Sequence, residues 1–424
     1  MKPGYKQTEV GVIPEQWEVH TLRSCLTAQP DYGINAPAVP YSDKLPAYIR
    51  ITDISEVGRF SSEKPVSVKQ VDADCYYLNE GDIVFARTGA SVGKSYLYDL
   101  KDGKLVFAGF LIRVRPNLTK LVPAYLAGYI MTGAYWNWVR LMSMRSGQPG
   151  INGQEYGRLP VPLPPLLEQR AIATTLSDVD GLLGGLDRLI AKKRDLKQAA
   201  MQQLLTGQTR LPGFHGEWEV KTFGELFNFS GGYSASRDQL SSEGHCYLHY
   251  GDIHGATKTT VDVRADYQNI PKLHIPLNRV AAKSLLDDGD VVFVDASEDD
   301  EGASRHVVVV NKEEQPFIAG LHTIVAKSKT DELVHEYRRF CFQTAAIRQQ
   351  FLFYAVGTKV SGISKTNIAK LTMPVPKVQE QTSIAEVLMD MDVELAALEQ
   401  RREKTRALKQ AMMQELLTGK TRLL

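Results

Sequence analysis

The residues whose spacing first suggests chemistry form a glycine-rich segment, Gly89-Ala-Ser-Val-Gly-Lys-Ser95. It ends in Gly-Lys-Ser, as does the loop that holds phosphate in nucleotide-hydrolysing proteins. That loop needs four residues between its first glycine and Gly-Lys-Ser, and this segment has three. We therefore interpret it as a glycine-rich turn between strands, in which Lys94 and the neighbouring Arg87 and Thr88 are candidates for contact with phosphate groups.

Histidines and carboxylates are the other candidates for chemistry. Three histidines lie within residues 245–254, beside Cys246, but they match no zinc-ligand spacing, so we expect structural or DNA-facing roles and no metal site. Acidic runs at residues 287–290 and 299–301 leave open a metal-dependent nuclease. We find neither a cofactor loop with an adenine-methylation motif, nor a helicase nucleotide site, nor a nuclease carboxylate-lysine cluster. The sequence therefore predicts a chain that is not an enzyme and carries no cofactor.

Composition bounds the class of protein. The chain has 424 residues, of which 43% are hydrophobic and 23% charged, enough for two or three globular domains. No apolar run approaches the roughly 18 residues of a membrane span, and the first residues lack a signal-peptide layout, so we expect a cytoplasmic protein without membrane partners. Four widely spaced cysteines suggest no disulfide framework.

An internal repeat organises the chain. Leu159–Leu211 aligns without a gap on Leu371–Leu423, a shift of 371 − 159 = 212 residues. The preceding segments repeat more weakly but in the same order: EQWEV matches GEWEV, YIRITDI matches YLHYGDI, and EGDIVF matches DGDVVF. Two copies that keep one segment and vary the rest indicate one docking surface used twice beside two different readers.

The varying parts and the shared parts predict different structures. Short β-type runs such as Ile83–Phe85 and Val291–Val294, followed by helical stretches, predict a mixed α/β domain with a twisted antiparallel sheet in each copy. The shared segments open with Pro-rich stretches and continue as long helices that end near Gly207 and Gly419. Trp17 and Trp218 occupy equivalent positions, and we expect both to be core anchors.

Each long helix carries an apolar seam of the coiled-coil type, in which apolar residues recur in steps of four and three. The seam residues are Ile172, Leu176, Val179, Leu183 and Leu186 in the first helix, and Ile384, Leu388, Met391, Leu395 and Leu398 in the second. After a basic patch, the pattern resumes at Leu196 and Leu204, with Leu408 and Leu416 as counterparts. The economical packing is an antiparallel coiled coil of the two helices with pseudo-twofold symmetry.

The predicted fold class is therefore α+β, with two similar mixed α/β domains joined by two long helices. We expect these reader domains at residues 1–160 and 212–372, and spacer helices at residues 161–211 and 373–424. The polar face of the helices, with Asp180 and Asp392, is expected to be merely solvated.

This order of parts resembles the specificity (S) subunits, HsdS, of Type I restriction-modification systems along the entire chain. The resemblance rests on the duplicated helix, which opens with Glu168-Gln169 or Glu380-Gln381 and closes with Leu-Leu-Thr-Gly, and on Glu80–Gly89. It implies sequence-specific binding of double-stranded DNA, each domain reading half of a bipartite site. It also implies two methyltransferase subunits, which bring S-adenosylmethionine, and restriction subunits that translocate DNA and cleave it.

The residues that we expect to contact DNA are mostly polar or basic and lie near the predicted strand ends and loops: Arg50, Arg87, Thr88, Ser91, Lys94, Arg145, Gln148, Asn152, His249, Arg305, Thr358, Lys359, Ser361 and Lys365. In the second copy, the acidic Ser297–Gly302 replaces the glycine-rich segment. Carboxylates accept hydrogen bonds from cytosine amino groups but repel phosphate, so we interpret it as a solvated loop. An independent nuclease and a scaffold without DNA contact remain the alternative functions.

Overall fold

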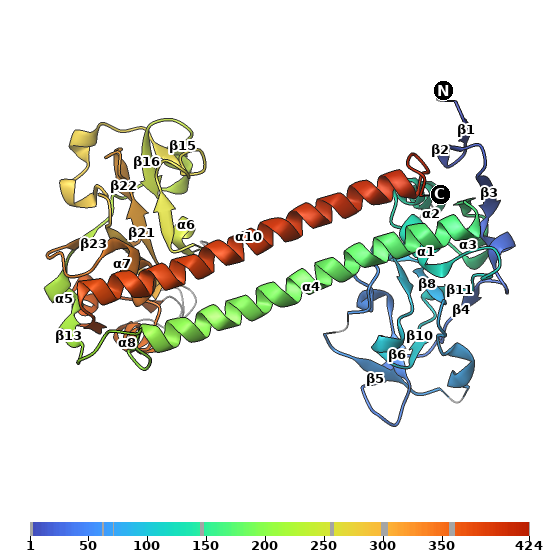
Figure 1. Cartoon of the computed structure of the whole chain (residues 1–424), viewed down its shortest axis with the longest axis horizontal. Helices are drawn as coiled ribbons and strands as arrows, with labels where there is room; N and C mark the ends of the chain where they lie inside the picture. Colours follow the sequence, from blue (N-terminus) through green and yellow to red (C-terminus); the bar gives the residue numbers. More distant parts are fainter. Residues whose placement is uncertain are drawn as a thin grey trace. The chain divides into compact units, whose positions relative to one another are not determined.

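The structure, a computed structural model, describes residues 3–61, 63–70, 72–144, 148–254, 258–297, 304–355 and 361–423. The chain divides into two compact units, Met1–Arg188 with Glu399–Leu424 (unit 1) and Leu189–Leu398 (unit 2). Each unit therefore holds one globular α/β part together with half of each long helix (Figure 1).

The globular part of unit 1 is built on two four-stranded sheets. One has the order β4 (Asp31–Tyr32), β11 (Leu111–Val114), β8 (Ile83–Ala86), β9 (Ser95–Leu97) and is antiparallel. The other has the order β10 (Leu105–Phe107), β6 (Ala47–Ile49), β7 (Val66–Val68), β5 (Ala38–Pro40). Strand β10 is parallel to β6, so the predicted sheet is mixed rather than wholly antiparallel.

Short helices and two-stranded pairs complete unit 1. The helices are α1 (Pro123–Tyr129), α2 (Gly133–Ser143) and α3 (Gly153–Gly157). The pairs are β1 (Tyr5–Thr8) with β2 (Gly11–Pro14), and β3 (Glu18–Thr21) with β12 (Pro160–Leu163). The apolar run of β8 is wholly buried, as its sequence predicts for a central strand.

Unit 2 repeats this plan with longer strands. Its main sheet has the order β14 (Phe227–Gly231), β23 (Thr323–Ser328), β19 (Val291–Val294), β21 (His306–Val310), β17 (Thr260–Asp262). Its second sheet has the order β15 (Leu240–Ser241), β18 (Lys272–Leu273), β16 (His245–Leu248), β22 (Phe317–Ala319). Strands β13 (Glu219–Thr222) and β25 (Thr372–Val375) pair, as do β20 (Ala296–Ser297) and β24 (Ser361–Gly362). The helices are α5 (Phe223–Leu226), α6 (Tyr250–His254), α7 (His335–Cys341), α8 (Ala345–Tyr354) and α9 (Lys365–Ile368).

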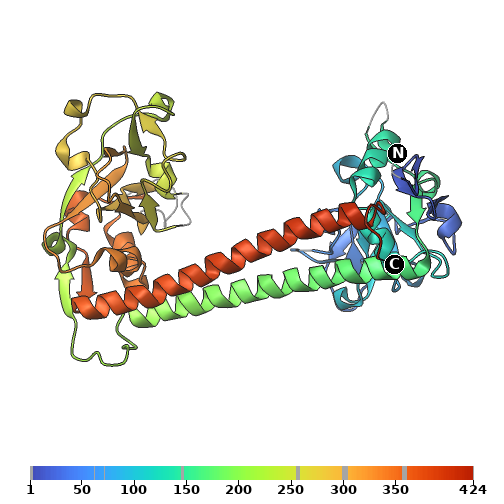
Figure 2. The ribbon, with the colours of Figure 1, turned by 45° about the horizontal axis from the view of Figure 1, so that its top comes forward.

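The two long helices are α4 (Leu166–Leu204) and α10 (Val378–Leu416). In unit 1 the first half of α4 shares a core with the end of α10, for example Ile172 with Leu416. In unit 2 the end of α4 shares a core with the start of α10, for example Leu204 with Ile384. The two helices therefore run antiparallel, as predicted, and both ribbon views draw them side by side (Figure 2).

The predicted apolar seam is confirmed, because all ten of its residues are buried or half-buried. The continuation at Leu196 and Leu408 is wrong, since these side chains are 46% and 56% exposed. Both lie one position before the seam, whose register in steps of four and three passes through Lys197 and Lys409. Leu204 and Leu416 are in register and are buried, as predicted.

Ion pairs join the two helices within each unit. Lys409 Nζ lies 2.7 Å from Asp180 in unit 1, and the repeat counterparts Lys197 and Asp392 pair in unit 2. The acidic face that we expected to be only solvated therefore contributes interhelical ion pairs.

A buried carboxylate holds the start of each long helix against its globular part. In unit 1, Glu168 is fully buried, and Trp17 Nε1 donates to it at 3.2 Å. The Arg422 guanidinium donates to the same carboxylate, at 2.7 Å from Nη2 to Oε2, and lies over the Trp17 ring. We refer to this trio, and to its counterpart in unit 2, as the clasp.

The unit 2 clasp has the same chemistry. Trp218 Nε1 donates to Glu380 at 3.0 Å, and Arg210 Nη2 donates to that carboxylate at 2.6 Å. Arg210 follows the first long helix and Arg422 follows the second. Each repeat thus supplies the arginine that closes the other repeat's clasp. Trp17 is fully buried and Trp218 partly buried, so both are anchors as expected.

The glutamine beside each clasp glutamate fixes the neighbouring helix of the globular part. Gln169 Oε1 accepts from the Val122 amide at the start of α1, and its Nε2 donates to the carbonyl oxygens of Lys120 and Pro164. Gln381 repeats this pattern with Val334 at the start of α7. The Glu-Gln dipeptide therefore sets the position of each α/β part on its helix.

We expect Arg422→Ala to lower the free energy of unfolding of unit 1 by about 3 kcal/mol, because it leaves the buried Glu168 charge without its cationic partner. The measurement is urea unfolding followed by tryptophan fluorescence. Arg406→Ala is the matched control: Arg406 and its partner Glu403 are both 53% exposed, and the expected loss is below about 1 kcal/mol. Equal losses in the two variants would contradict the clasp's structural role.

His306 gives the core of unit 2 a pH dependence. It is buried between the rings of Phe293 and Phe342, and burial lowers its pKa to about 4. In the unfolded chain its pKa is about 6.5, so between about pH 6.5 and pH 4 only the unfolded state takes up the proton. We expect the free energy of unfolding to decrease as the pH is lowered through this window, by up to about 1.4 kcal/mol per pH unit. Above about pH 6.5, His306 should make no contribution to the pH dependence.

The test is hydrogen exchange in β19 and β21 at about pH 7.5 and about pH 5, corrected for intrinsic exchange rates. His306→Phe removes the titrating group and keeps an aromatic ring in the cluster. The variant should lose less protection than the parent on acidification. An identical acid response in both proteins would rule out His306 as its source.

Candidate nucleic-acid interface

The two units place equivalent residues at the end of an equivalent hairpin. In unit 1 the Arg87 amide donates to the Phe110 carbonyl at 3.0 Å, and the Arg87 carbonyl accepts from the Ile151 amide at 2.9 Å. In unit 2 the Asp295 amide donates to the His322 carbonyl at 3.1 Å, and the Asp295 carbonyl accepts from Ile363 at 2.8 Å. Arg87 and Asp295 are therefore structural counterparts, as are Phe110 and His322. We refer to these two places as hairpin end 1 and hairpin end 2.

Hairpin end 1 combines a cation with exposed aromatic rings. The Arg87 guanidinium lies 4.9 Å from the centre of the Tyr32 ring. Tyr32 and Phe110 are 41% and 58% exposed. The Tyr32 hydroxyl accepts a hydrogen bond from the Gly153 amide at 2.9 Å, which fixes the ring. A guanidinium on an aromatic face with a second ring nearby suits the recognition of planar groups.

Several predicted residues gather at hairpin end 1. Thr88 pairs with Gly150, and the Gln148 amide nitrogen lies close to Gly89, so that a Cβ at Gly89 would come within 3.1 Å of it. The Asn152 side chain accepts from the Glu155 amide and caps α3. The structure therefore brings together Arg87, Thr88, Gln148 and Asn152.

The glycine-rich segment is a turn between β8 and β9, as predicted. Ser91 lies in its short 3-10 helix, Gly89–Ser91. Gly93 has a φ of +91°, and a Cβ there would meet the Val139 side chain at 2.7 Å, so the turn requires glycine. Lys94 pairs with Glu56 at 2.6 Å and is only 20% exposed, which leaves less of its charge for a ligand.

Hairpin end 2 is built from acidic and aromatic groups. Asp295 Oδ1 lies 3.3 Å from His322 Nδ1. The Tyr250 ring meets the His322 ring edge-on at 5.4 Å, and the His249 ring lies 4.6 Å from Tyr250. Burial lowers the pKa of His249, and the nearby Arg237 guanidinium lowers it further.

The remaining predicted residues are placed as follows. Arg50, the counterpart of His249, forms a two-point ion pair with Asp53 at 2.8 and 2.9 Å. Lys365 opens α9, and the Arg305 carbonyl accepts from Val294. Ser361 lies in β24, and Arg145, Thr358 and Lys359 lie outside the described residues.

Sequence reasoning missed Tyr32, Phe110, Tyr250 and His322 at these sites. Phe110 and His322 follow the matching segments VFAG and FIAGL, so the repeat itself could have pointed to them. Tyr32 stands between two turn residues and carries no comparable signal.

The acidic run proposed for a nuclease is engaged in structural contacts. Lys327 Nζ lies 2.6 Å from both Asp287 and Asp290. Asp288 accepts from the Asn311 amide at 2.8 Å. Residues 299–301 lie outside the described part of the chain. Among the described residues, no group of three or more His, Cys, Asp or Glu is arranged to hold a metal ion.

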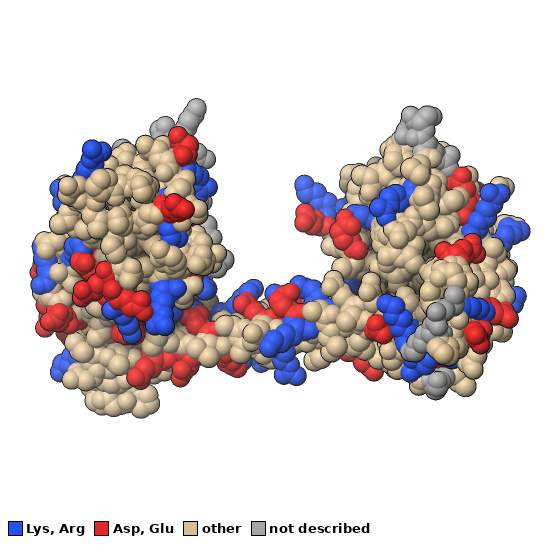
Figure 3. Space-filling view, turned by 90° about the horizontal axis from the view of Figure 1, so that it is seen from above, with Lys and Arg blue, Asp and Glu red and all other residues tan. Residues whose placement is uncertain are grey.

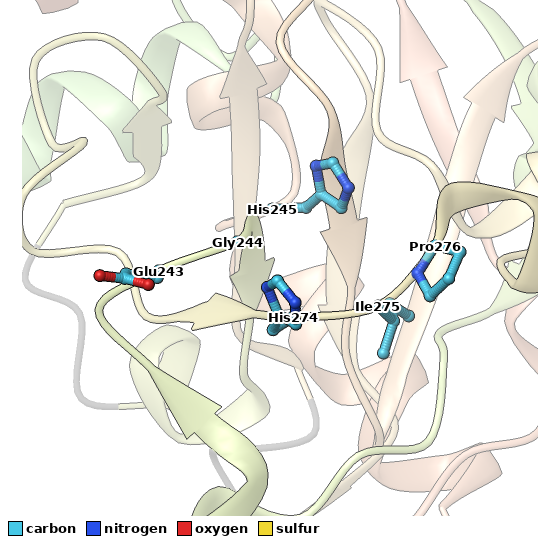
Figure 4. Close-up of a pocket in the computed structure, with 6 residues that line it drawn as sticks. All are labelled: Glu243, Gly244, His245, His274, Ile275 and Pro276. Atoms are coloured by element: carbon cyan, nitrogen blue, oxygen red, sulfur yellow. The ribbon is translucent and has the colours of Figure 1, made fainter.

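A cavity of about 520 Å³ opens beside β16 and β18, lined by Glu243, Gly244, His245, His274, Ile275 and Pro276. His245 begins β16, His274 directly follows β18, and Glu243 points away from both imidazoles (Figure 4). On the face drawn in Figure 3, basic and acidic side chains are interspersed over each unit. On that face, a DNA contact would rely on locally placed groups rather than on a continuous basic field.

A family model for the Type I restriction modification DNA specificity domain matches residues 31–190 and 215–406. The two matches fall on the two copies of the repeat and span most of the chain. The chain belongs to the Type I restriction-modification DNA specificity family. The predicted resemblance is confirmed.

Specificity-family relatives match nearly end to end. The chain is 23% identical to the Type I restriction enzyme MjaVIII specificity subunit of Methanocaldococcus jannaschii, over 97% of this chain and 94% of the relative. It is 25% identical to the Type I restriction enzyme EcoKI specificity subunit of Escherichia coli, over 88% of this chain and 82% of the relative.

Two solved structures share the specificity-family fold. The HsdS subunit from Thermoanaerobacter tengcongensis matches with a TM-score of 0.52 and 17% identity, over 96% of this chain and 98% of that one. The Type I S subunit from M. genitalium matches with a TM-score of 0.53 and 14% identity, over 94% and 96%. At these identities the likeness shows the fold alone. Within the described residues, no helix has the length and apolarity needed to span a membrane.

Proposed function

We propose that this chain selects the DNA site for a Type I restriction-modification complex, with each unit reading one half of a bipartite sequence. The observation that carries the proposal is that the two copies keep the same supporting contacts but differ in the side chains at their hairpin ends. The clasps, the Gln169 and Gln381 contacts and the helix seam are kept. The side chains at the two hairpin ends differ in charge, although the backbone makes the same two hydrogen bonds at both ends.

Such a contrast suits a chain that must dock twice in the same way and read two different sequences. The α4–α10 pair offers two equivalent faces, which supports two methyltransferase subunits as partners. These subunits would bring S-adenosylmethionine and methylate adenine, and restriction subunits would join for cleavage. The chain itself would contribute recognition without catalysis. The ion pairs of Asp287 and Asp290 with Lys327 count against the nuclease alternative.

The test is to co-express the chain with its methyltransferase partner and to map methylated adenines across the genome by single-molecule sequencing. We expect one bipartite motif that appears only when this chain is present. A correctly assembled, cofactor-bound complex that yields no motif would instead favour the scaffold alternative.

The coiled coil should set the spacing between the half-sites. Deleting Gly185–Ala191 and its counterpart Ala397–Glu403 removes seven residues from each helix and preserves the seam's phase. Each helix becomes about 10 Å shorter, or about three base pairs of duplex. We expect the methylated motif to keep both half-sites with a shorter gap, or methylation to be lost. An unchanged gap would contradict the spacer role.

A further inference from the structure

The two hairpin ends carry opposite chemistry at one equivalent position. Resting on the proposed function, we infer that Arg87 reads a guanine in one half-site and that Asp295 reads a base amino group, of cytosine or adenine, in the other. The two residues make the same pair of backbone hydrogen bonds and follow matching buried strands, β8 and β19. The difference between the sites therefore lies in the side chains and not in the backbone.

The Arg87 guanidinium lies over the Tyr32 ring, and that ring is tethered through its hydroxyl to the Gly153 amide. A ring face offers the guanidinium no hydrogen-bond acceptor, which leaves its N–H groups for a ligand. Two parallel donors match the O6 and N7 acceptors of guanine in the major groove, the commonest specific contact of arginine with DNA.

The Asp295 carboxylate presents acceptors only. Oδ1 is buried and lies 3.3 Å from His322 Nδ1, whereas the whole side chain is 33% exposed. The exposure therefore falls on the rest of the side chain, which includes the second carboxylate oxygen. A carboxylate accepts from an exposed amino group of a base and is repelled by phosphate.

Behind each site, a glycine and a larger side chain occupy a pair of counterpart positions in opposite order. Tyr32 and Gly231 are counterparts, because the following amides, Gly33 and Gly232, make the same bond to β11 and β23. Gly153 and Lys365 are counterparts in the repeat. In unit 1 the ring occupies the space and glycine faces it, since a Cβ at Gly153 would lie 3.5 Å from the Tyr32 hydroxyl.

In unit 2 glycine and the large side chain have changed places. A Cβ at Gly231 would lie 3.5 Å from Lys365 Nζ, so the lysine ammonium lies close to where a side chain would begin at the position that Tyr32 has in unit 1. Unit 2 therefore has a cation near the place where unit 1 has a ring. Lys365 is placed to contact a phosphate while Asp295 faces a base, which relieves the repulsion that an isolated carboxylate would meet.

The experiment uses the complex of the full chain with its methyltransferase partner. Methylation motifs are mapped for Arg87→Ala, Asp295→Asn and the control Lys104→Ala, which removes an exposed charge near the opposite end of the β8–β9 hairpin. We expect Arg87→Ala to lose discrimination at one guanine in one half-site, and Asp295→Asn at one cytosine or adenine in the other. Each loss should be about 10-fold to 100-fold, with the opposite half-site unchanged.

Modified bases identify the atoms. Binding of the parent complex to a duplex with 7-deazaguanine at the Arg87-dependent position should fall, and the same base should cost the Arg87→Ala complex nothing further. The inference is overturned if the parent gives a bipartite motif that both variants reproduce, or if both variants affect the same half-site. The failure of the parent to give any motif is a separate result, because it overturns the proposed function itself.

Discussion

The buried carboxylate at the start of each long helix is the interaction on which the rest of the structure depends. Glu168 and Glu380 lie at 0% and 1% exposure, a position that is costly for a charge unless it is paired and hydrogen-bonded. Each is satisfied by an indole N–H and an arginine. Because that arginine comes from the end of the other repeat, neither repeat by itself supplies the cation that pairs with its buried carboxylate. The requirement ties chain segments that are far apart in sequence into the same unit.

A rigid frame of this kind permits divergence at its surface. The glutamine next to each clasp fixes α1 or α7, and the hairpins are held by backbone hydrogen bonds that do not depend on the side chains at their ends. Arg87 and Asp295 can therefore differ without disturbing the strands that carry them. The positions of Tyr32 and Lys365 show how far this goes, since each faces a glycine at the counterpart of the other residue.

The repeat made much of the fold predictable. Matching segments gave the order of domains and helices, and the apolar seam gave the antiparallel pair, because burial imposes a period that sequence preserves. Leu196 and Leu408 were misjudged because the in-register positions beside them are lysines, Lys197 and Lys409, so the apolar pattern is hidden there and a neighbouring leucine is mistaken for it. The clasp arginines were missed because their partners lie 170 and 254 positions away, and spacing carries no information at that range. For the same reason the sequence placed Arg87 in a loop but did not place Tyr32 beneath it.

Residues 212–372 carry 21 Asp and Glu against 17 Lys and Arg, and this acidic balance is compatible with DNA recognition. A reader made only of cations gains affinity for phosphate but no selectivity, because phosphates are the same at every step of the duplex. Selectivity comes from groups that match one base edge and penalise the others, and a carboxylate penalises every edge that presents acceptors. Unit 2 combines such a group, Asp295 beside His322, with the cation of Lys365 beside Gly231. In unit 1 one residue serves both purposes, because the Arg87 guanidinium carries a positive charge and also presents parallel N–H donors to a base. Base recognition and attraction of phosphate are thus assigned to two residues in unit 2 and to one residue in unit 1. The net charge of a copy therefore says little about which copy contacts DNA.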